Sequence, residues 1–581
     1  MRDETASVIR KLRGGVLVGK TLREKGVDCV FTLSGGFINP ILEGLQLHGI
    51  RVVNAPHEQI AGHLADGMAR LTRLPAVCLA GPEGMGNAVP AMLEAFGARS
   101  PVVFITGSST LKRRGQGGFK EVDHVRIAEA LTKSSVLVTD GNRIPDFIDK
   151  AFEIAVSGNP GPVHLSIPTD LLYSSFAEPI ERTERPFAHA MATERLAWPD
   201  PAGISELDAM FRQSRHPVIV AGSGVWWGRA ELELARYAND RGIPVLIVPY
   251  HQNLFADHCP AYCGLADVHQ FPPAEYALSE ADLIVTFGCR LDNMLNFGSP
   301  PLMSAQARLV CVDGSSDDAG ANHAADWRLL GHPRAVLQQL IGRAEARPWT
   351  TSPSWLEDNR RARALWIEGL HALLQREGGE RPMHPLFVSM AVIDALGPAD
   401  YLVIDGGDTH YWAEMALNAA EFAGKTLRGV FHPGPMSLLG CGIAFGLAIR
   451  MKHPDSRVVV LCGDGAFLSS GLSIETAFNE SLPITVVIDN NRGLGSIAQQ
   501  QMRVWESGKP IGTAFRDIPF DGLFNGLGGH GETVEAPEEI GAALQRAMKS
   551  GLPACVNVKS RSVISPLVAA LTDRRAKASI E

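Results

Sequence analysis

Several features that would mark a secreted, membrane or nucleic-acid-binding protein are missing from this sequence. The 9 cysteines are scattered singly without a C-x-x-C pair, which argues against a disulfide framework or a structural zinc site. No apolar run reaches the roughly 20 residues that span a bilayer, and the opening MRDETASVIRKLRGG holds no apolar signal segment. The net charge is -9, whereas nucleic-acid binding needs a basic surface. We therefore expect a cytoplasmic protein that binds neither membrane nor nucleic acid.

What the sequence does have is a regular alternation of short apolar, β-branched runs with longer amphipathic stretches. The runs are Val27–Leu33, Ala76–Ala80, Val102–Thr106, Val163–Ile167, Val218–Ala221, Leu283–Phe287, Val310–Val312, Leu402–Ile404, Val458–Leu461, Ile484–Ile488 and Ala554–Val558. Mostly apolar strands separated by helices are typical of parallel sheets covered on both faces. The predicted fold class is α/β, with doubly wound parallel sheets.

The length of 581 residues is too great for one hydrophobic core. Two stretches, about 175–203 and about 345–385, are rich in proline and charge, and we predict that both are linkers. They divide the chain into three domains and a tail: 1–178, 200–342, 380–560 and 561–581. The first and third domains are similar in size and pattern but share no repeat of residues, so any common fold is structural only.

The clearest chemical motif lies in the third domain, in the run VVVLCGDGAFLSSG. A strand over Val458–Leu461 leads into Gly463-Asp464-Gly465, and a second strand ends at Asn490-Asn491. In a parallel sheet both strand ends open on the same edge, which is where ligands bind. The glycines let a backbone approach phosphate groups closely and present its N–H groups to them.

The same motif supplies oxygen ligands of the kind that Mg²⁺ prefers. Asp464 offers a carboxylate, Asn491 an amide carbonyl and Gly493 a backbone carbonyl. Mg²⁺ takes few ligands from protein and fills its octahedron with phosphate and water oxygens. The Gly-Asp-Gly turn alone would be ordinary, but paired with Asn-Asn at this spacing it predicts a magnesium diphosphate site.

Gly-Asp-Gly followed at this distance by Asn-Asn resembles the signature of thiamine diphosphate enzymes. The resemblance covers most of the chain, in the order pyrimidine-binding, middle and diphosphate-binding domain. It implies thiamine diphosphate and Mg²⁺ as cofactors, with Asp464, Asn491 and Gly493 on the metal. The cofactor-binding positions that it implies are Gly407, Asp408, Leu438, Leu439, Gly463, Asp464, Gly465, Ala466, Asn491, Gly493, Leu494 and Gly495.

The family also needs a glutamate in its first domain, which hydrogen-bonds the aminopyrimidine ring and so activates the cofactor. The stretch RVVNAPHEQIAGHLADGMAR resembles that region, and Glu58 takes the position. Relatives place a bulky apolar side chain under the bent cofactor, and Leu439 takes that place in HPGPMSLLGCGIAFGLAIR. The run VIDGGDTHYW resembles the loop that cups the diphosphate, around Gly407 and Asp408.

The substrate is indicated by two further resemblances to 2-hydroxyacyl-CoA lyases and oxalyl-CoA decarboxylases. Phe119, Lys120 and Glu121 match their run of an aromatic, a polar residue and glutamate. The stretch FGCRLDNMLNFGSPP resembles their R-L-N-W-x-L-x-x-G run, and departs from it at Asp292-Asn293. Its matching residues are Arg290, Leu291, Leu295 and Gly298. The family's nucleotide pocket lies nearby and would take an ADP or CoA moiety; acetolactate synthases hold FAD in this domain, which we do not expect here.

The overall sequence pattern is also similar to that of benzaldehyde lyase, but Phe37 occupies the position where that enzyme has a histidine. No decarboxylase His-His pair is visible, so the acyl-CoA group is favoured. Phe37 and Phe119 would shape an apolar pocket, with core packing as the alternative. The tail carries Arg574, Arg575 and Lys577, which would meet CoA phosphates if the tail closes over the site; a frayed terminus is the alternative.

The predicted function is therefore that of a 2-hydroxyacyl-CoA lyase, which releases an aldehyde or ketone and formyl-CoA. The catalytic residues are Glu58, Phe37, Phe119, Glu121 and Leu439. The alternatives are an acetolactate-synthase-like or benzaldehyde-lyase-like carboligase and an oxalyl-CoA-type decarboxylase. A catalytically silent scaffold is disfavoured because the glutamate and the metal ligands are intact. The resemblance also implies a homo-oligomer, at least a dimer and expected to be a tetramer, in which the activating glutamate and the metal ligands come from different chains.

Overall fold

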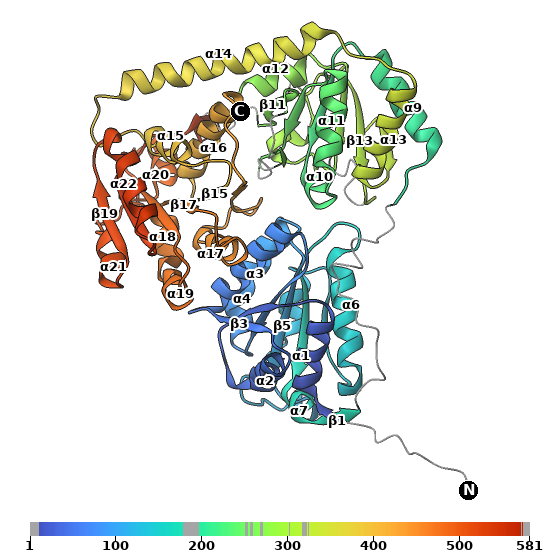
Figure 1. Cartoon of the computed structure of the whole chain (residues 1–581), viewed down its shortest axis with the longest axis vertical. Coiled ribbons are helices and arrows are strands. Elements are labelled where there is room, and N and C mark those ends of the chain that lie inside the picture. The colour runs from blue at the N-terminus through green and yellow to red at the C-terminus, as the bar shows by residue number, and fades with distance from the viewer. Residues whose placement is uncertain are drawn as a thin grey trace. The chain divides into compact units, whose positions relative to one another are not determined.

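The computed structural model describes residues 11–177, 197–249, 254–255, 259–267, 271–300, 302–316, 322, 325–566, 568–570 and 572. These contain three parallel six-stranded sheets, one in each predicted domain (Figure 1). The predicted α/β class is confirmed. Arg574, Arg575 and Lys577 lie outside the described residues. No helix in the described part of the chain combines the length and apolar character that crossing a membrane requires.

The N-terminal sheet has the strand order β3-β2-β4-β5-β7-β6. Its strands are β2 Cys29–Thr32, β3 Arg51–Asn54, β4 Ala76–Ala80, β5 Val102–Ser108, β6 Ser135–Leu137 and β7 Val163–Pro168. The helices are α1 Gly14–Glu24, α2 Asn39–Leu47, α3 Glu58–Thr72, α4 Gly84–Gly97, α5 His124–Glu129, α6 Ile144–Val156 and α7 Thr169–Tyr173. Apolar side chains of α1, α2 and α6 form one core with this sheet, while α3 and α4 pack together away from that core. Short strands β1 Lys11–Arg13 and β8 Ser175–Ala177 pair antiparallel.

The middle sheet has the order β11-β10-β9-β12-β13-β14, the dinucleotide-binding order in which the first strand lies at the centre. Its strands are β9 Pro217–Ala221, β10 Val245–Ile247, β11 Tyr262–Leu265, β12 Leu283–Phe287, β13 Arg308–Asp313 and β14 Trp327–Leu330. The helices are α9 Pro201–Gln213, α10 Ser223–Trp227, α11 Glu231–Arg241, α12 Pro273–Ser279 and α13 Pro333–Ala346.

The C-terminal sheet has the order β16-β15-β17-β18-β20-β19, which repeats the connectivity of the N-terminal sheet. Its strands are β15 Tyr401–Asp405, β16 Gly429–Phe431, β17 Val458–Gly463, β18 Thr485–Asn490, β19 His530–Val534 and β20 Ala554–Lys559. The helices are α15 Pro385–Ala395, α16 Asp408–Phe422, α17 Gly442–Lys452, α18 Asp464–Ser470, α19 Glu475–Asn479, α20 Gly495–Val504, α21 Phe520–Gly526 and α22 Pro537–Lys549. The first and third sheets thus share a topology although their sequences show no repeat.

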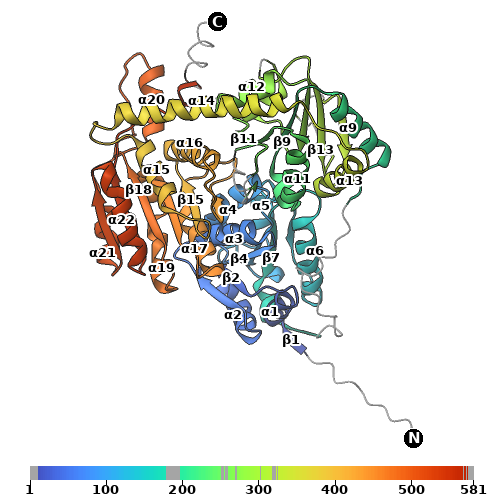
Figure 2. The same ribbon diagram turned by 45° about the horizontal axis from the view of Figure 1, so that its top comes forward.

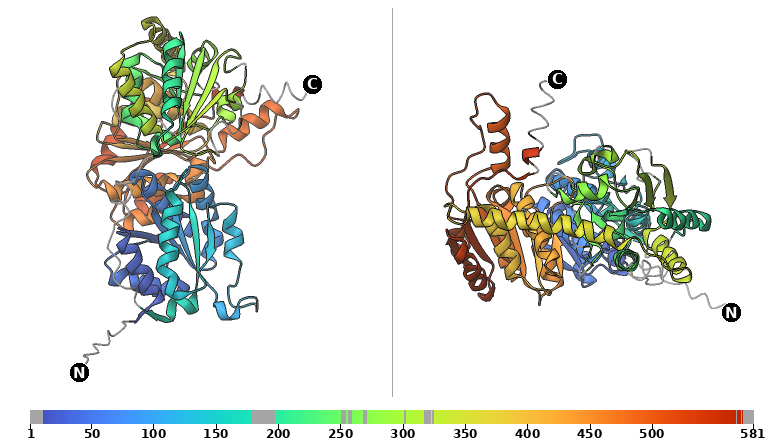
Figure 3. Two further views of the ribbon diagram at one scale, coloured as in Figure 1. Left: turned by 90° about the vertical axis from the view of Figure 1, so that its right-hand side faces the viewer. Right: turned by 90° about the horizontal axis from the view of Figure 1, so that it is seen from above.

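The prediction of a linker over 345–385 was wrong for most of that stretch. Residues Pro353–Glu377 form the 25-residue helix α14, which Figure 2 and the right-hand view of Figure 3 show as one long yellow rod. Trp355, near its start, is buried in the core of the middle domain. Ile367 and Leu370, further along, are buried in the core of the C-terminal domain. The weakly amphipathic, proline-flanked sequence of this helix predicts a linker. The helix is stabilised by its packing against the two domain cores.

By its internal contacts the described chain divides into two compact units. One contains the N-terminal domain together with residues 434–452 and 472–482, and the other contains the middle domain and the rest of the C-terminal domain. The loop before α17, which carries Leu438 and Leu439, therefore belongs with the N-terminal domain. The domain boundaries drawn from the sequence stay a prediction.

Candidate functional site

The predicted diphosphate motif lies at the carboxyl edge of the C-terminal sheet. Strand β17 lies between β15 and β18, with Cys462 paired to Asp405 and Gly463 paired to Asp489. The loop after β15, the Gly-Asp-Gly run after β17 and the Asn-Asn run after β18 therefore meet at one edge. Strand order also reverses between β15 and β17, and α/β sheets bind their ligands at such a switch point.

Asp464, the first residue of α18, is held by two backbone N–H groups. Its Oδ1 accepts from the N–H of Gly465 at 2.7 Å and its Oδ2 accepts from the N–H of Gly493 at 2.9 Å. Burial raises the pKa of Asp464 to about 7, because the two hydrogen bonds only partly offset desolvation and the nearby charge of Asp489 adds to it. A carboxylate that is fixed in position and has the negative Asp489 nearby is suited to binding a cation.

Asn490 and Asn491 have different surroundings. The Asn490 amide is buried and donates from Nδ2 to Asn557 Oδ1 at 2.9 Å, so it ties β18 to β20. The Oδ1 of Asn491 is also shielded from solvent, yet it has no hydrogen-bond partner among the described residues. Of the two asparagines it is therefore Asn491 that has an oxygen available for a ligand.

The available donors fit Mg²⁺. They are the Asp464 carboxylate, the unpartnered amide oxygen of Asn491 and the carbonyl of Gly493, which already accepts from the N–H of Gly495 at 3.0 Å. The described residues contain no cluster of three or more His, Cys, Asp or Glu side chains that could hold a metal alone. Mg²⁺ takes few ligands from protein and fills its coordination shell with phosphate and water oxygens, so these donors would suffice for it.

Glycines at this edge allow close approach of the backbone. A Cβ on Gly493 would lie 2.4 Å from the carbonyl oxygen of Thr513, and one on Gly465 would lie 2.7 Å from Leu494 Cδ2. A Cβ on Gly495 would lie 2.9 Å from the amide nitrogen of Asn491. Side chains at these positions would push apart the loops that present the oxygen donors.

The loop after β15 is the third segment that lies at this edge of the sheet. Gly407 precedes α16, and Asp408 is the first residue of that helix. Burial raises the pKa of Asp408 to about 6, an increase that Ser565 lessens. The next residue, Thr409, donates to Asp489 Oδ2 at 2.9 Å and so links this loop to β18. Ala466 is buried in α18 beside the same edge.

Glu58 lies in the other compact unit, at the carboxyl edge of the N-terminal sheet. It is the first residue of α3 and is only 5% exposed. Its Oε2 accepts from Asn87 Nδ2 at 2.9 Å. A Cβ on Gly84 would lie 2.5 Å from Glu58 Oε1, so the glycine at the start of α4 is what gives this carboxylate its space.

The loop that carries Leu438 and Leu439 is anchored by buried charges of the N-terminal domain. Glu94 accepts from the backbone N–H groups of Gly434 and, at 3.3 Å, of Leu438. Arg70 pairs with Glu94 at 2.9 Å and with Asp66 at 2.7 Å. Leaving one member of such a buried pair unpartnered costs about 3–5 kcal/mol, so this network fixes the loop firmly.

The residues expected around the substrate lie on the same edge as Glu58. Phe37 and Phe119 have ring centroids 6.3 Å apart, and Phe119 is 77% exposed, so core packing does not account for it. Glu121 accepts from the backbone N–H of Gly118 at 2.8 Å and from that of Gly115. The hydrogen bond from Gly115, and after it the one from Gly118, hold the pKa of Glu121 below its usual range. Its contacts therefore shape the loop, and its catalytic role stays a prediction.

Sequence reasoning missed the residues that set these groups in place. Gly84 and Asn87 touch Glu58, Glu83 pairs with Lys120, and Glu94 anchors the loop before α17. The stretch GPEGMGN after β4 offered a signal, because a glycine-rich strand end at the carboxyl edge of a parallel sheet lies beside the ligand site. Glu94 offered none, since its partners are far away in the sequence.

In the middle domain, the stretch resembling the nucleotide pocket follows β12. Leu291 and Leu295 are buried in the domain core and Arg290 is exposed. Asp292 accepts from the N–H of Met294 at 3.1 Å and so caps the turn over Asn293–Gly298. The strand order of this sheet suits a nucleotide, and nucleotide binding here stays a prediction.

Comparison with known proteins agrees with this geometry. Residues 12–127 match the family described as thiamine pyrophosphate enzyme, N-terminal TPP binding domain, residues 204–340 the central domain and residues 405–558 the C-terminal TPP binding domain. These three domains in this order define the class of thiamine pyrophosphate enzymes.

Relatives of full length refine the assignment. The acetolactate synthase large subunit IlvG of Mycobacterium tuberculosis is 31% identical over 96% of this chain and 97% of its own length. The 2-hydroxyacyl-CoA lyase of Arabidopsis thaliana is 27% identical over 99% of both chains. Mouse 2-hydroxyacyl-CoA lyase 1 is 25% identical over 94% of this chain and 93% of its own. The chain belongs to the acetolactate synthase-like superfamily of thiamine pyrophosphate enzymes.

Proposed function

We propose that this enzyme cleaves 2-hydroxyacyl-CoA thioesters to an aldehyde or ketone and formyl-CoA, or joins them in the reverse direction. The observation that carries the proposal is the aromatic pair of half-buried Phe37 and exposed Phe119 on the sheet edge that holds Glu58. An apolar surface of this kind suits an acyl chain or a thioester better than it suits a small charged acid. Similarity over the full length of a 2-hydroxyacyl-CoA lyase supports it.

The residues have distinct roles in this proposal. When bound, thiamine diphosphate would supply a nucleophilic carbon and an electron sink for carbonyl chemistry. Glu58 exchanges a proton with the aminopyrimidine ring, which activates that carbon. Asp464, Asn491 and the carbonyl of Gly493 hold Mg²⁺ against the diphosphate. Leu439 would give the cofactor an apolar support.

A second candidate is an acetolactate-synthase-like carboligase. The 31% identity to an acetolactate synthase large subunit over nearly the whole chain favours it. So does Lys120, whose ammonium lies beside the aromatic pair and would suit the carboxylate of a 2-oxo acid. Both candidates use the same cofactor chemistry and differ in the substrate that they accept.

The two candidates are separated by their products. The purified protein, loaded with thiamine diphosphate and Mg²⁺, is incubated with a panel of 2-hydroxyacyl-CoA thioesters of increasing chain length, and separately with pyruvate. The proposal expects formyl-CoA and an equimolar aldehyde from the thioesters, detected by mass spectrometry. Acetolactate from pyruvate without any formyl-CoA from the thioesters would replace it with the second candidate.

We further propose that the chain works as a homo-oligomer, at least a dimer. Helix α20 and the segment after it expose large apolar side chains that a second copy would cover. They are Ile497, Met502, Val504, Trp505 and Ile511. Light scattering coupled to size-exclusion chromatography measures the assembly, and a monomer that keeps full activity would contradict it.

A further inference from the structure

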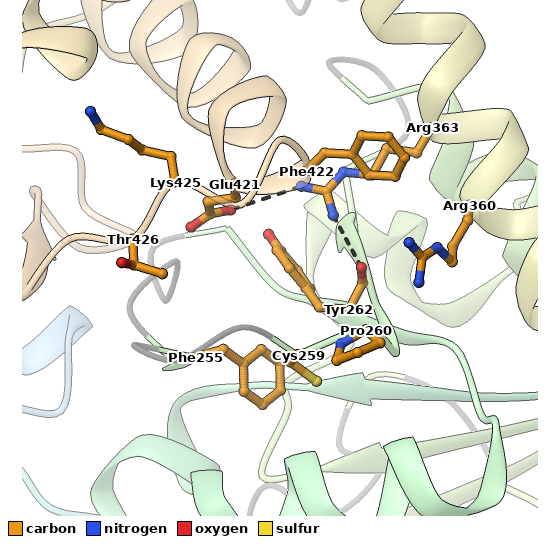
Figure 4. Close-up of a pocket in the computed structure, with 10 residues that line it drawn as sticks. All are labelled: Phe255, Cys259, Pro260, Tyr262, Arg360, Arg363, Glu421, Phe422, Lys425 and Thr426. Carbon is orange, nitrogen blue, oxygen red and sulfur yellow. Dashed lines mark hydrogen bonds and ion pairs between the residues drawn. The ribbon is translucent and has the colours of Figure 1, made fainter. Parts of the chain in front are cut away.

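A small cavity lies between the middle and C-terminal domains, inside one of the two compact units. Its volume is about 40 Å³, which is room for about three water molecules. Residues of α14, of β11 and of the end of α16 surround it (Figure 4). Helix α16 begins with Asp408 at the diphosphate edge and runs for 15 residues, roughly 20 Å, before it reaches the cavity. The cavity is therefore separate from the cofactor site.

Arg363 of α14 brings a buried positive charge to this cavity. Its side chain is only 2% exposed. The guanidinium donates to the carbonyl oxygens of Tyr262 at 3.1 Å and of Asn418 at 2.6 Å, while its Nε has no partner among the described residues. The ring centroids of Tyr262 and Phe422 lie 4.7 and 5.3 Å from its Cζ. Carbonyl groups and rings stabilise a guanidinium, but they leave its charge without a counter-ion.

A second arginine lies on the same face of α14. Arg360 precedes Arg363 by three residues, lines the same cavity and is half-buried. Within the part of the chain that the structure describes, Arg360 makes no hydrogen bond or ion pair. Like charges three residues apart on a helix repel each other. The two arginines are therefore unfavourable here unless a negative charge neutralises them.

Glu421 supplies only part of that negative charge, and it is the only carboxylate among the described residues that line the cavity. Its Oε2 lies 4.0 Å from Arg363 Nη2, too far for a hydrogen bond, and has no partner in the described chain. Burial raises the pKa of Glu421 to about 7, although Arg363 and then Tyr262 oppose the shift. The carboxyl group is thus only partly ionised near neutral pH, and it does not neutralise two arginines.

The other polar groups at the end of α16 are already used. The carbonyl oxygens of Ala419 and Ala420 accept from the backbone N–H groups of Ala423 and Lys425. The ammonium of Lys425 is directed away from the two arginines and donates to the carbonyl of Asp394 at 3.1 Å (Figure 4). The donors that remain for a ligand are therefore those of the two guanidinium groups.

We propose that this cavity binds a phosphate group, held by Arg360 and Arg363. A carboxylate ligand would bring no more charge than Glu421 does, whereas a phosphate group carries about 1.5 to 2 negative charges and several oxygens that accept strongly. Planar guanidinium groups match phosphate oxygens with parallel N–H bonds. The occupant is free phosphate or the phosphate group of a monoester. The inference is independent of the carbonyl chemistry proposed above.

The alternative is that Arg363 and Glu421 only join the two domains. The two explanations differ in what they predict for Glu421. If the pair is only a bridge, removing the charge of Glu421 weakens the junction and phosphate does not bind in either form. If the cavity binds phosphate, Glu421 competes with the ligand, and removing its charge strengthens binding.

The test measures phosphate binding directly. The protein loaded with thiamine diphosphate and Mg²⁺, so that the diphosphate edge is occupied, is titrated by calorimetry with inorganic phosphate in a phosphate-free buffer. Arg360→Gln should weaken binding about tenfold or more, the usual effect of losing a charge-assisted hydrogen bond. Glu421→Gln should bind phosphate about threefold or more tightly, because a nearby negative charge is gone. Arg363 stays unchanged in the test, since it holds α16 and β11 and its loss could unfold the protein.

Arg361→Gln is the matched control, because Arg361 is exposed on the same helix and does not line the cavity. Its affinity for phosphate should stay within about twofold of that of the unmodified protein. Phosphate should raise the melting temperature of the unmodified protein and of Arg361→Gln, and should raise that of Arg360→Gln much less. Glycerol 3-phosphate distinguishes the two sources: if it binds as well as phosphate, the occupant is a monoester, and if it does not bind, the occupant is free phosphate.

The proposal is overturned if the unmodified protein does not bind phosphate, or if Arg360→Gln binds it as tightly as the unmodified protein does. It is also overturned if Glu421→Gln, shown to be folded by circular dichroism, binds phosphate more weakly. A failure to form formyl-CoA would remove the lyase proposal and would not affect this result.

Discussion

At the scale of single residues, the site depends on small residues that leave space for functional side chains. Glu58 is buried at the first position of α3 and accepts one hydrogen bond, from Asn87. Its other oxygen faces Gly84, where any side chain would intrude. The position of this carboxylate thus depends on the lack of a side chain at Gly84 as well as on the hydrogen bond from Asn87.

Replacing Gly84 by alanine should displace Glu58 without unfolding the protein. The added Cβ would lie 2.5 Å from Glu58 Oε1, and the end of a flexible side chain can move to relieve that contact. A misplacement of about 1 Å costs roughly 100-fold in rate, so we expect a loss of that order in turnover. Gly86→Ala is the matched control, because a Cβ there meets nothing within 4 Å. Equal activity of the two variants would show that Gly84 does not position Glu58.

If Asp464 holds Mg²⁺ as proposed, its ionisation makes metal binding depend on pH. Its pKa in the folded protein, about 7, lies above the value of about 3.9 in an unfolded chain. Ionising it therefore disfavours the metal-free fold, whose stability falls as the pH rises from about 4 to 7. Mg²⁺ binds the ionised form, so its affinity should rise about tenfold per pH unit up to pH 7 and then level off. Calorimetry of Mg²⁺ with thiamine diphosphate at several pH values measures this.

The matched variant for this titration is Asp464→Asn, which removes the titratable carboxyl group and keeps the size and shape of the side chain. It should bind Mg²⁺ more weakly and without the rise between pH 5 and 7. A pH dependence that survives in Asp464→Asn would assign the titration to another group, with Asp408 the nearest alternative because its pKa is also raised, to about 6.

At the scale of secondary structure elements, the strands were largely predictable and one helix was not. The apolar run Leu283–Phe287 and the run Ala76–Ala80 coincide with β12 and β4, because buried parallel strands need unbroken apolar sequence. Helix α14 has prolines before it and glycines after it, and its buried residues are spread thinly along 25 residues. Only the two cores on which it packs make it a helix, and those contacts are not visible in its sequence.

A proline in the middle of α14 tests whether the helix is needed. Leu365 is 61% exposed, so its side chain contributes little to packing. Leu365→Pro removes a backbone hydrogen bond inside the helix and should lower the free energy of unfolding by about 3 kcal/mol or more. Leu365→Ala at the same position should change it by less than about 0.5 kcal/mol. Urea unfolding of both variants measures the difference, and near-equal values would mean that the segment acts as a flexible connection.

The parts of the site that could be predicted are those whose residues lie close together in the sequence. Asp464, Gly465 and Gly493 were predicted from two strand ends, and they are joined by hydrogen bonds in the structure. The different surroundings of Asn490 and Asn491 could not be predicted, because they depend on Asn557 in a neighbouring strand. Glu94 was missed for the same reason, since its partners lie in the loop before α17. Sequence shows which strand ends carry chemistry, and packing decides which side chains are left available.

At the scale of the whole molecule, the chain combines two sheets of one topology with a third of a different order. The N-terminal and C-terminal sheets each present a polar carboxyl edge, one with Glu58 and the other with Asp464. Between β11 and the end of α16 lies a small cavity, where Arg363 donates to the carbonyl of Tyr262 and lies 4.0 Å from Glu421 (Figure 4). These buried contacts join the middle and C-terminal domains within one compact unit.

Mixing two inactive variants tests whether the proposed active site is shared between chains. Glu58→Gln and Asp464→Asn should each be inactive alone. If the two residues serve one site from different chains, subunit exchange places both intact groups in some of the sites. We expect roughly a quarter of normal activity in an equal mixture of dimers. A mixture that stays inactive after complete subunit exchange, checked by mass spectrometry of the assembled species, would place both residues of each site in a single chain.

The central claim is that Glu58 activates thiamine diphosphate held at the Asp464 edge. The direct measurement is the exchange of the cofactor's reactive thiazolium proton with deuterium, followed by NMR after rapid acid quenching of the loaded protein. Glu58→Gln should slow this exchange about 100- to 10,000-fold, the usual contribution of a positioned acid–base group, while still binding the cofactor. Exchange at the normal rate in Glu58→Gln, with cofactor bound, would contradict the account.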